Sequence, residues 1–133
     1  MQIAAGYVTA LVVFVVIDAA WLSVMGNLLY RPTLGDILLP TLRVAPAIVF
    51  YAAFPVGILV FAVMPALKAD AITTAVLYGL LFGALAYATY DLTNYETLRN
   101  WNLPITLLDL TYGAIATAAA AAAATLVARM VTA

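Results

Sequence analysis

The chain has 133 residues, of which 68% are hydrophobic and only 8% are charged. Soluble domains carry roughly 25% charged residues, so the composition predicts an integral membrane protein. The formal net charge of -1 argues against nucleic acid as a partner, because no basic face is available to neutralise phosphates. With no cysteine and no histidine, the sequence offers no haem, iron–sulfur or structural zinc site, and we expect no cofactor.

Four apolar segments are each long enough to cross a bilayer, which takes about 20 helical residues. They predict an all-α fold, a transmembrane four-helix bundle made of a single domain. The first segment lacks a basic n-region and contains Asp18, so we do not expect a cleaved signal peptide. The spans are predicted at about 3–29, 44–66, 71–93 and 103–127.

The connection between the first two spans, from Pro32 to Arg43, is the longest one. Its apolar residues recur at helical spacing, at Leu34, Ile37, Leu38 and Leu42. This spacing predicts a short interfacial amphipathic segment that lies on the membrane surface between spans 1 and 2.

Small residues and a proline indicate how the spans pack. Gly79 and Gly83 form a GxxxG pair, which allows another helix to approach closely. The alanine run 118–124 favours the same kind of contact in the fourth span. Pro55 should kink the second span and free a backbone carbonyl near Tyr51.

A polar block, residues 87–94, closes the third span with a carboxylate, an amide, two phenols and two hydroxyls. A bilayer core offers no water, so these groups must find protein partners or line a hydrated cavity. Asp18 and Asp109 lie inside other apolar spans. Because successive spans run in opposite directions, these acids, Asp91 and Tyr51 should all lie in one half of the bundle, leaving the other half nearly bare of polar side chains.

Three carboxylates close together in a low dielectric cannot all stay ionised, so at least one should hold a proton near neutral pH. A structural reading is that they pair with Arg99, Arg43 or backbone donors and fix helix register. For the constellation as a whole we favour a functional site. The candidate pocket or proton-binding residues are Asp18, Trp21, Tyr51, Tyr87, Tyr90, Asp91, Asn94, Arg99, Asp109 and Tyr112.

Several motifs resemble a known family in their order along the chain. They are Asp18-Ala19-Ala20-Trp21-Leu22, Tyr30-Arg31-Pro32 with Gly35, Phe50-Tyr51, Phe61 with Pro65, the block Tyr87-Ala88-Thr89-Tyr90-Asp91-Leu92-Thr93-Asn94, Thr97-Leu98-Arg99 with Trp101, and Asp109 with Gly113. The chain resembles the bacterial membrane proteins grouped as domain of unknown function 2177, with Tyr112 where tryptophan is expected. The resemblance implies a four-span, multi-pass protein of the bacterial inner membrane and no established activity.

Three functions are compatible with these residues. The first is a pocket for an amphipathic small molecule, such as a lipid or an isoprenoid, in which the three aspartates act as acid/base groups or hard-cation ligands. The second is proton-linked transport by a homodimer, with Gly79 and Gly83 as one possible seam. The third is a non-catalytic accessory subunit that packs against a larger membrane complex through its alanine-rich fourth span. We favour the pocket.

Overall fold

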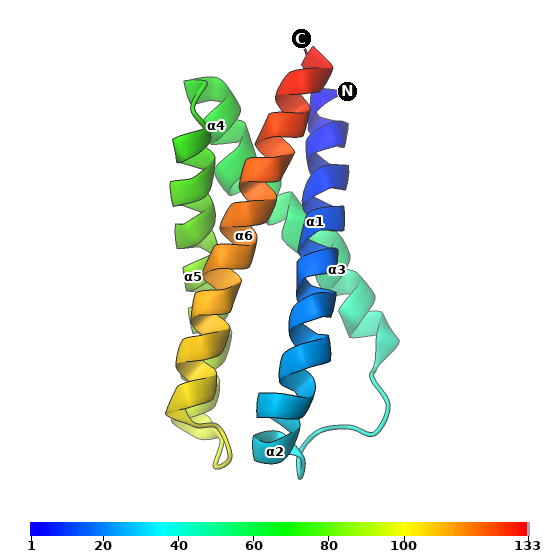
Figure 1. Cartoon of the computed structure of the whole chain (residues 1–133), viewed down its shortest axis with the longest axis vertical. Helices are drawn as coiled ribbons and strands as arrows, with labels where there is room; N and C mark the ends of the chain where they lie inside the picture. Colours follow the sequence, from blue (N-terminus) through cyan, green and yellow to red (C-terminus); the bar gives the residue numbers. More distant parts are fainter. Residues whose placement is uncertain (133) are drawn as a thin grey trace.

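The structure is a computed structural model that describes residues 1–132, and these residues contain helices and no strand (Figure 1). The elements are α1 (Gln2–Met25), the π-turn η1 (Gly26–Tyr30), α2 (Arg31–Leu34), α3 (Val44–Ile58), the π-turn η2 (Leu59–Val63), α4 (Met64–Ala69), α5 (Ile72–Thr97) and α6 (Leu103–Thr132). They join into four stretches that are long and apolar enough to cross a membrane, namely Gln2–Leu34, Val44–Ala69, Ile72–Thr97 and Leu103–Val131. The predicted all-α four-helix fold is confirmed.

Helix α6 is the central element, since it packs against α5 on one side and α1 on the other (Figure 1). The contact with α5 is close because glycines remove the side chains between the backbones. A Cβ on Gly79 would lie 2.8 Å from the Cα of Ala118, and one on Gly83 would lie 2.6 Å from the carbonyl oxygen of Gly113. Both glycines are therefore used within the chain, and the suggestion that they form a seam between two copies is wrong.

The second stretch bends where Pro55 is followed by η2. Proline and π-turns are both recognised causes of helix kinks. Figure 1 shows that α3 runs away from the bundle toward the long loop, whereas α4 stays beside α5. The first part of α3 consequently exposes Val44, Ile48 and Val49.

The loop between α2 and α3 differs from its prediction. Only Arg31–Leu34 is helical there, and these residues continue the first stretch instead of forming a separate segment. Residues 35–43 form turns and bends, although their leucines have helical spacing. Pro40 provides the reason, because proline lacks the amide donor that a helix needs and disfavours helical backbone in the residue before it.

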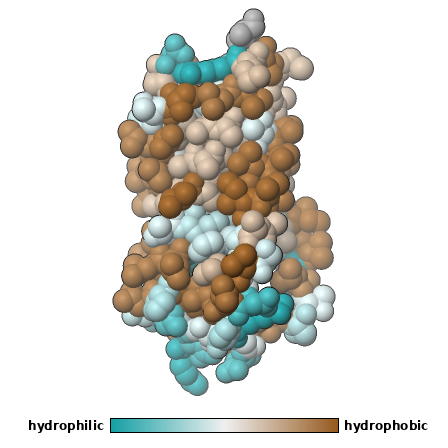
Figure 2. Space-filling view, viewed as in Figure 1, coloured by the Kyte–Doolittle hydropathy of each residue, from teal (hydrophilic) through white to brown (hydrophobic). Residues whose placement is uncertain are grey.

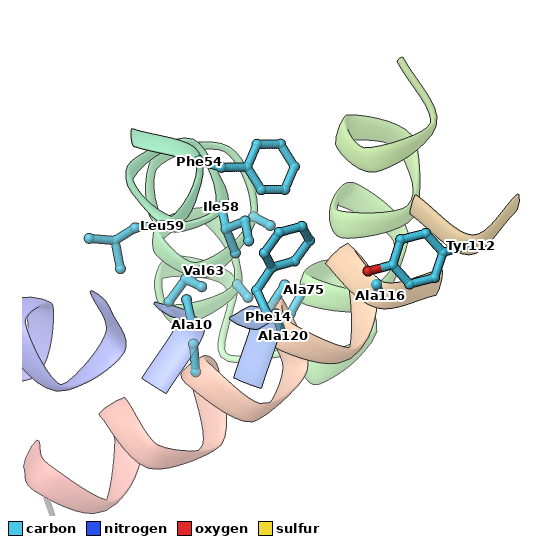
Figure 3. Packing of buried hydrophobic residues seen from close by; sticks show 14 residues of the cluster. Ala10, Phe14, Phe54, Ile58, Leu59, Val63, Ala75, Tyr112, Ala116 and Ala120 are labelled. Atoms are coloured by element: carbon cyan, nitrogen blue, oxygen red, sulfur yellow. The ribbon is translucent and has the colours of Figure 1, made fainter. Parts of the chain in front are cut away.

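The apolar core lies toward the end of the bundle that holds both termini and the α4–α5 turn. Phe14, Ile58 and Val63 are fully buried there, among alanines of α1, α5 and α6 (Figure 3). Outside the core, large apolar side chains cover most of the surface in Figure 2, and hydrophilic residues gather at its two ends. Such a surface suits a bilayer, which is hydrocarbon in the middle and polar at both faces.

Candidate functional site

Asp18 of α1 joins three helices through its carboxylate. Its side chain is buried, with 7% of its surface exposed. The hydroxyl of Tyr112 in α6 donates a hydrogen bond to Oδ1 over 2.6 Å, and the hydroxyl of Tyr51 in α3 donates to Oδ2. Each oxygen of the Asp18 carboxyl group thus has a phenolic donor.

An aromatic cluster surrounds this carboxylate. The ring of Trp21 stacks on Tyr112 with centroids 4.3 Å apart and planes 12° apart. Tyr87 of α5 meets Tyr112 edge to face at 5.9 Å and Phe54 of α3 at 6.4 Å. The four rings bring side chains of all four helical stretches together beside Asp18.

A second hydrogen-bonded chain leads from Trp21 to Asp109. The indole Nε1 of Trp21 donates to the hydroxyl of Tyr30 over 2.9 Å, and that hydroxyl donates to Oδ1 of Asp109. Asp109 is 6% exposed and lies on α6. Trp21 therefore links the surroundings of the two acids. Its ring stacks on Tyr112, which donates to Asp18, and its N–H donates to Tyr30, which donates to Asp109.

Tyr30 is a site residue that was not among the predicted ones, since the sequence singled it out only as part of the motif Tyr30-Arg31-Pro32. At about 100° per residue, a regular helix would put Tyr30 about 120° around the axis from Asp18. The π-turn η1 holds one more residue than an α-helical turn. The extra residue sets later side chains back by about 100°, which brings Tyr30 to within about 20° of the Asp18 face.

Asp91 of α5 is more completely buried within the protein than the other two acids. It is 0% exposed, and neither of its oxygens has a hydrogen-bond donor among residues 1–132. Tyr87 of α5 lies directly against Gly113 of α6, so one turn further along these antiparallel helices Asp91 faces Asp109. The three acids thus form two groups, Asp18 with its two phenols and Asp91 with Asp109, instead of one cluster.

Three predicted site residues lie at the edge of this arrangement. Tyr90 is 55% exposed, and its ring meets Trp101 edge to face at 5.4 Å. Asn94 is half-buried on α5, and Arg99 is exposed in the α5–α6 loop.

The predicted pairing of the acids with Arg99 or Arg43 is wrong. The ion pair found within residues 1–132 joins Arg129 and Asp70 over 3.0 Å, at the other end of the bundle. Nor does any group of three acidic side chains in that range have the arrangement of a metal site. A role of the three aspartates as hard-cation ligands therefore has no support in the geometry.

Two hollows lie near these residues. One is an apolar groove of about 230 Å³ between α1 and α6, and the stacked rings of Trp21 and Tyr112 form part of its wall. The other, of about 480 Å³, is at the loop end, beside Glu96 and Arg99. The groove is lined by Ile17, Trp21, Tyr112, Ile115, Ala116 and Ala119.

The site combines hydrogen-bonded carboxyl groups and phenols with an apolar groove. Carboxyl groups and phenols joined by hydrogen bonds are suited to acid–base chemistry. The sequence contains neither a cysteine nor a histidine to serve as a nucleophile or as its activating base.

The family model described as predicted membrane protein (DUF2177) matches residues 3–126, which is nearly the whole chain. The chain belongs to this family, and it is a multi-pass membrane protein. No curated protein and no solved structure gives a significant match.

Proposed function

We propose that this member of the predicted membrane protein family DUF2177 binds the hydrocarbon chain of an amphipathic small molecule in the groove between α1 and α6. We propose the bacterial inner membrane as its location, in line with the family resemblance. The ligand class is a lipid or an isoprenoid that enters from the surrounding bilayer.

The observation that supports this proposal is the position of the apolar groove against the Trp21–Tyr112 stack. Its volume of about 230 Å³ is below the roughly 300–1,000 Å³ of sites that enclose drug-sized ligands. A single chain suits this space better than a whole lipid. Alanines at 116 and 119 leave room beside the rings, because a larger side chain at either position would fill it.

The wall of the groove connects the bound chain to the buried acids. Trp21 and Tyr112 line the groove, while their polar atoms donate to Tyr30 and Asp18. A ligand that moved either ring would therefore alter a hydrogen bond to an acid. This arrangement supports an acid–base role for Asp18 during binding.

The direct test is native mass spectrometry of the protein purified in detergent, comparing wild type with Ala119→Phe. Ala119 is exposed and lines the groove, so a phenylalanine there should fill the groove without entering the core. We expect wild type to retain one defined small mass per chain and the variant to lose it. Ala19→Phe is the matched control, because Ala19 is exposed on the opposite face of α1 from Trp21 and should leave the mass in place.

Retention of the same mass by Ala119→Phe, or a bare wild-type chain, would overturn the proposal. A protein partner retained in place of a small molecule would favour the accessory-subunit alternative. The transporter alternative has lost its suggested seam, since Gly79 and Gly83 pack against α6 within the chain. The alanine run is likewise used internally, with Ala118, Ala120, Ala121 and Ala124 all buried.

A further inference from the structure

Asp91 differs from every other acid of the site in having no donor. Its side chain is fully buried, and both carboxylate oxygens lack a hydrogen-bond partner among residues 1–132. An ionised carboxylate has about four acceptor positions to satisfy. Leaving them all empty away from water is strongly unfavourable, so a charged Asp91 is not a stable state of this interior.

The titratable groups around Asp91 are acids and phenols. Asp109 faces it from α6, Tyr30 lies near from η1, and Tyr90 precedes it on α5. The hydroxyl proton of Tyr30 is directed at Asp109 and so is not available to Asp91. The bases of the remaining packed elements are Lys68 in the last turn of α4 and Arg129 in the last turn of α6. Figure 1 shows α4 and the C-terminal end of α6 at the end of the bundle that holds both termini.

We infer that Asp91 and Asp109 hold one proton between their carboxyl groups and form a proton-binding site buried between α5 and α6. The proton makes one carboxyl a donor to the other, which gives Asp91 the partner that it otherwise lacks. The remaining negative charge is shared with Asp109, where the Tyr30 hydroxyl also donates. The exchange is balanced by solvent, since the pair takes up one proton from water and returns it there.

Asp18 provides the internal contrast. It is buried to a similar extent as Asp109, yet both of its oxygens already accept from phenols. The hydrogen-bonding capacity of its two oxygens is thus met by neighbouring side chains, whereas that of Asp91 is not. The inference does not depend on whether the groove between α1 and α6 is occupied.

Infrared spectroscopy can detect the proton directly, because a protonated carboxylic acid has a carbonyl stretch that a carboxylate lacks and that shifts in D₂O. The protein should be in a detergent without ester or acid carbonyls. At neutral pH we expect a band equal to one carboxylic acid per chain. Asp91→Asn should abolish it, because the amide then donates to Asp109 in place of the proton.

Two matched controls make the same carboxylate-to-amide change elsewhere. Asp18→Asn and Asp36→Asn, the latter in the exposed loop, should leave the band unchanged. A wild-type spectrum without the band, a band that survives in Asp91→Asn, or a band lost in Asp18→Asn would each overturn the inference. If Asp91→Asn does not fold, Asp109→Asn decides the matter, because it removes the other carboxyl of the pair and should abolish the band as well.

Discussion

The two halves of this bundle are held together in different ways. In the half that holds the termini, glycine and alanine bring α5 and α6 close enough for backbone contact, and small residues of α1 pack beside them. In the other half, the helices are joined by phenol–carboxylate hydrogen bonds and stacked rings around Asp18 and Asp109. The first mode has little to rearrange, whereas the second contains groups that can gain or lose protons.

The close packing of the first half also supports the second half. Membrane helices gain no hydrophobic driving force from contact with one another, so close van der Waals packing supplies much of their association. The alanine half provides that packing and holds the ends of the helices in place. The acidic half can then contain a buried carboxyl pair and an open groove, both of which would be costly in an unsupported bundle.

The largest predicted effect comes from breaking the close packing with Gly83→Leu. A Cβ at this position would lie 2.6 Å from the carbonyl oxygen of Gly113 and 2.7 Å from Cβ of Thr117. The backbone must therefore move. We expect the free energy of unfolding to fall by more than about 3 kcal/mol, which is above the usual range for overpacking. Unfolding in detergent followed by circular dichroism measures this loss.

Gly26→Leu is the matched control for that change, because a Cβ at Gly26 meets nothing within 4 Å. It should remain close to wild type in the same assay. Equal losses in the two variants would mean that the α5–α6 contact is not the source of the effect.

The next effect comes from the acidic half, through Asp18→Ala. The change leaves the Tyr112 hydroxyl buried without an acceptor and removes the partner of Tyr51. An unsatisfied buried polar group costs about 1–3 kcal/mol, and we expect a loss of about 2 kcal/mol here. The same unfolding assay applies, with Asp36→Ala in the exposed loop as a control that should change little.

A smaller loss in the free energy of unfolding, about 1 kcal/mol, is expected for Tyr30→Phe. The substitution removes the acceptor of the Trp21 N–H and one donor to Asp109 while keeping the ring. Fluorescence of Trp21, recorded in a Trp101→Phe background, should change because its hydrogen bond is lost. Tyr95→Phe, at an exposed position of α5, should alter neither quantity.

The smallest effect is expected at the ion pair of the packed half. Asp70 is 91% exposed, so its 3.0 Å contact with Arg129 is screened by solvent. Asp70→Asn keeps a residue type that tolerates the left-handed backbone found there, at φ 54. We expect the free energy of unfolding to fall by less than about 0.5 kcal/mol, and this difference should vanish at high salt. A larger loss would mean that this half of the bundle relies on charge as well as packing.

The fold could be predicted because apolar length alone identifies a membrane helix. The gathering of Asp18, Tyr51, Tyr87 and Tyr112 also follows from depth along alternating spans, and the structure brings these four side chains together. Depth does not specify which atoms meet, however. The division of the acids into two groups depends on how each helix is turned about its axis.

Helix rotation explains the residues that were misplaced. Tyr30 could not be assigned because the π-turn shifts its direction, and ideal periodicity assumes that no such turn occurs. Gly79 and Gly83 do mark a close helix contact, as predicted, and the approaching helix is α6. A GxxxG pair does not say whether that helix belongs to the same chain, which is why a seam between two copies was also considered. Arg99 was expected near the acids because of its position in sequence, but its loop points it toward solvent.

The π-turn η1 also has a consequence for how the length of this chain can vary. Removal of one residue there, such as the exposed Asn27, would restore a regular helical turn and leave Tyr30 on the face that it now occupies. Removal of one residue between Asp18 and Trp21 would instead rotate these two side chains apart by about 100°. Single-residue deletions should therefore be tolerated at residues 26–29 and not between Asp18 and Trp21, so a deletion scan of this stretch would locate the turn without any structure.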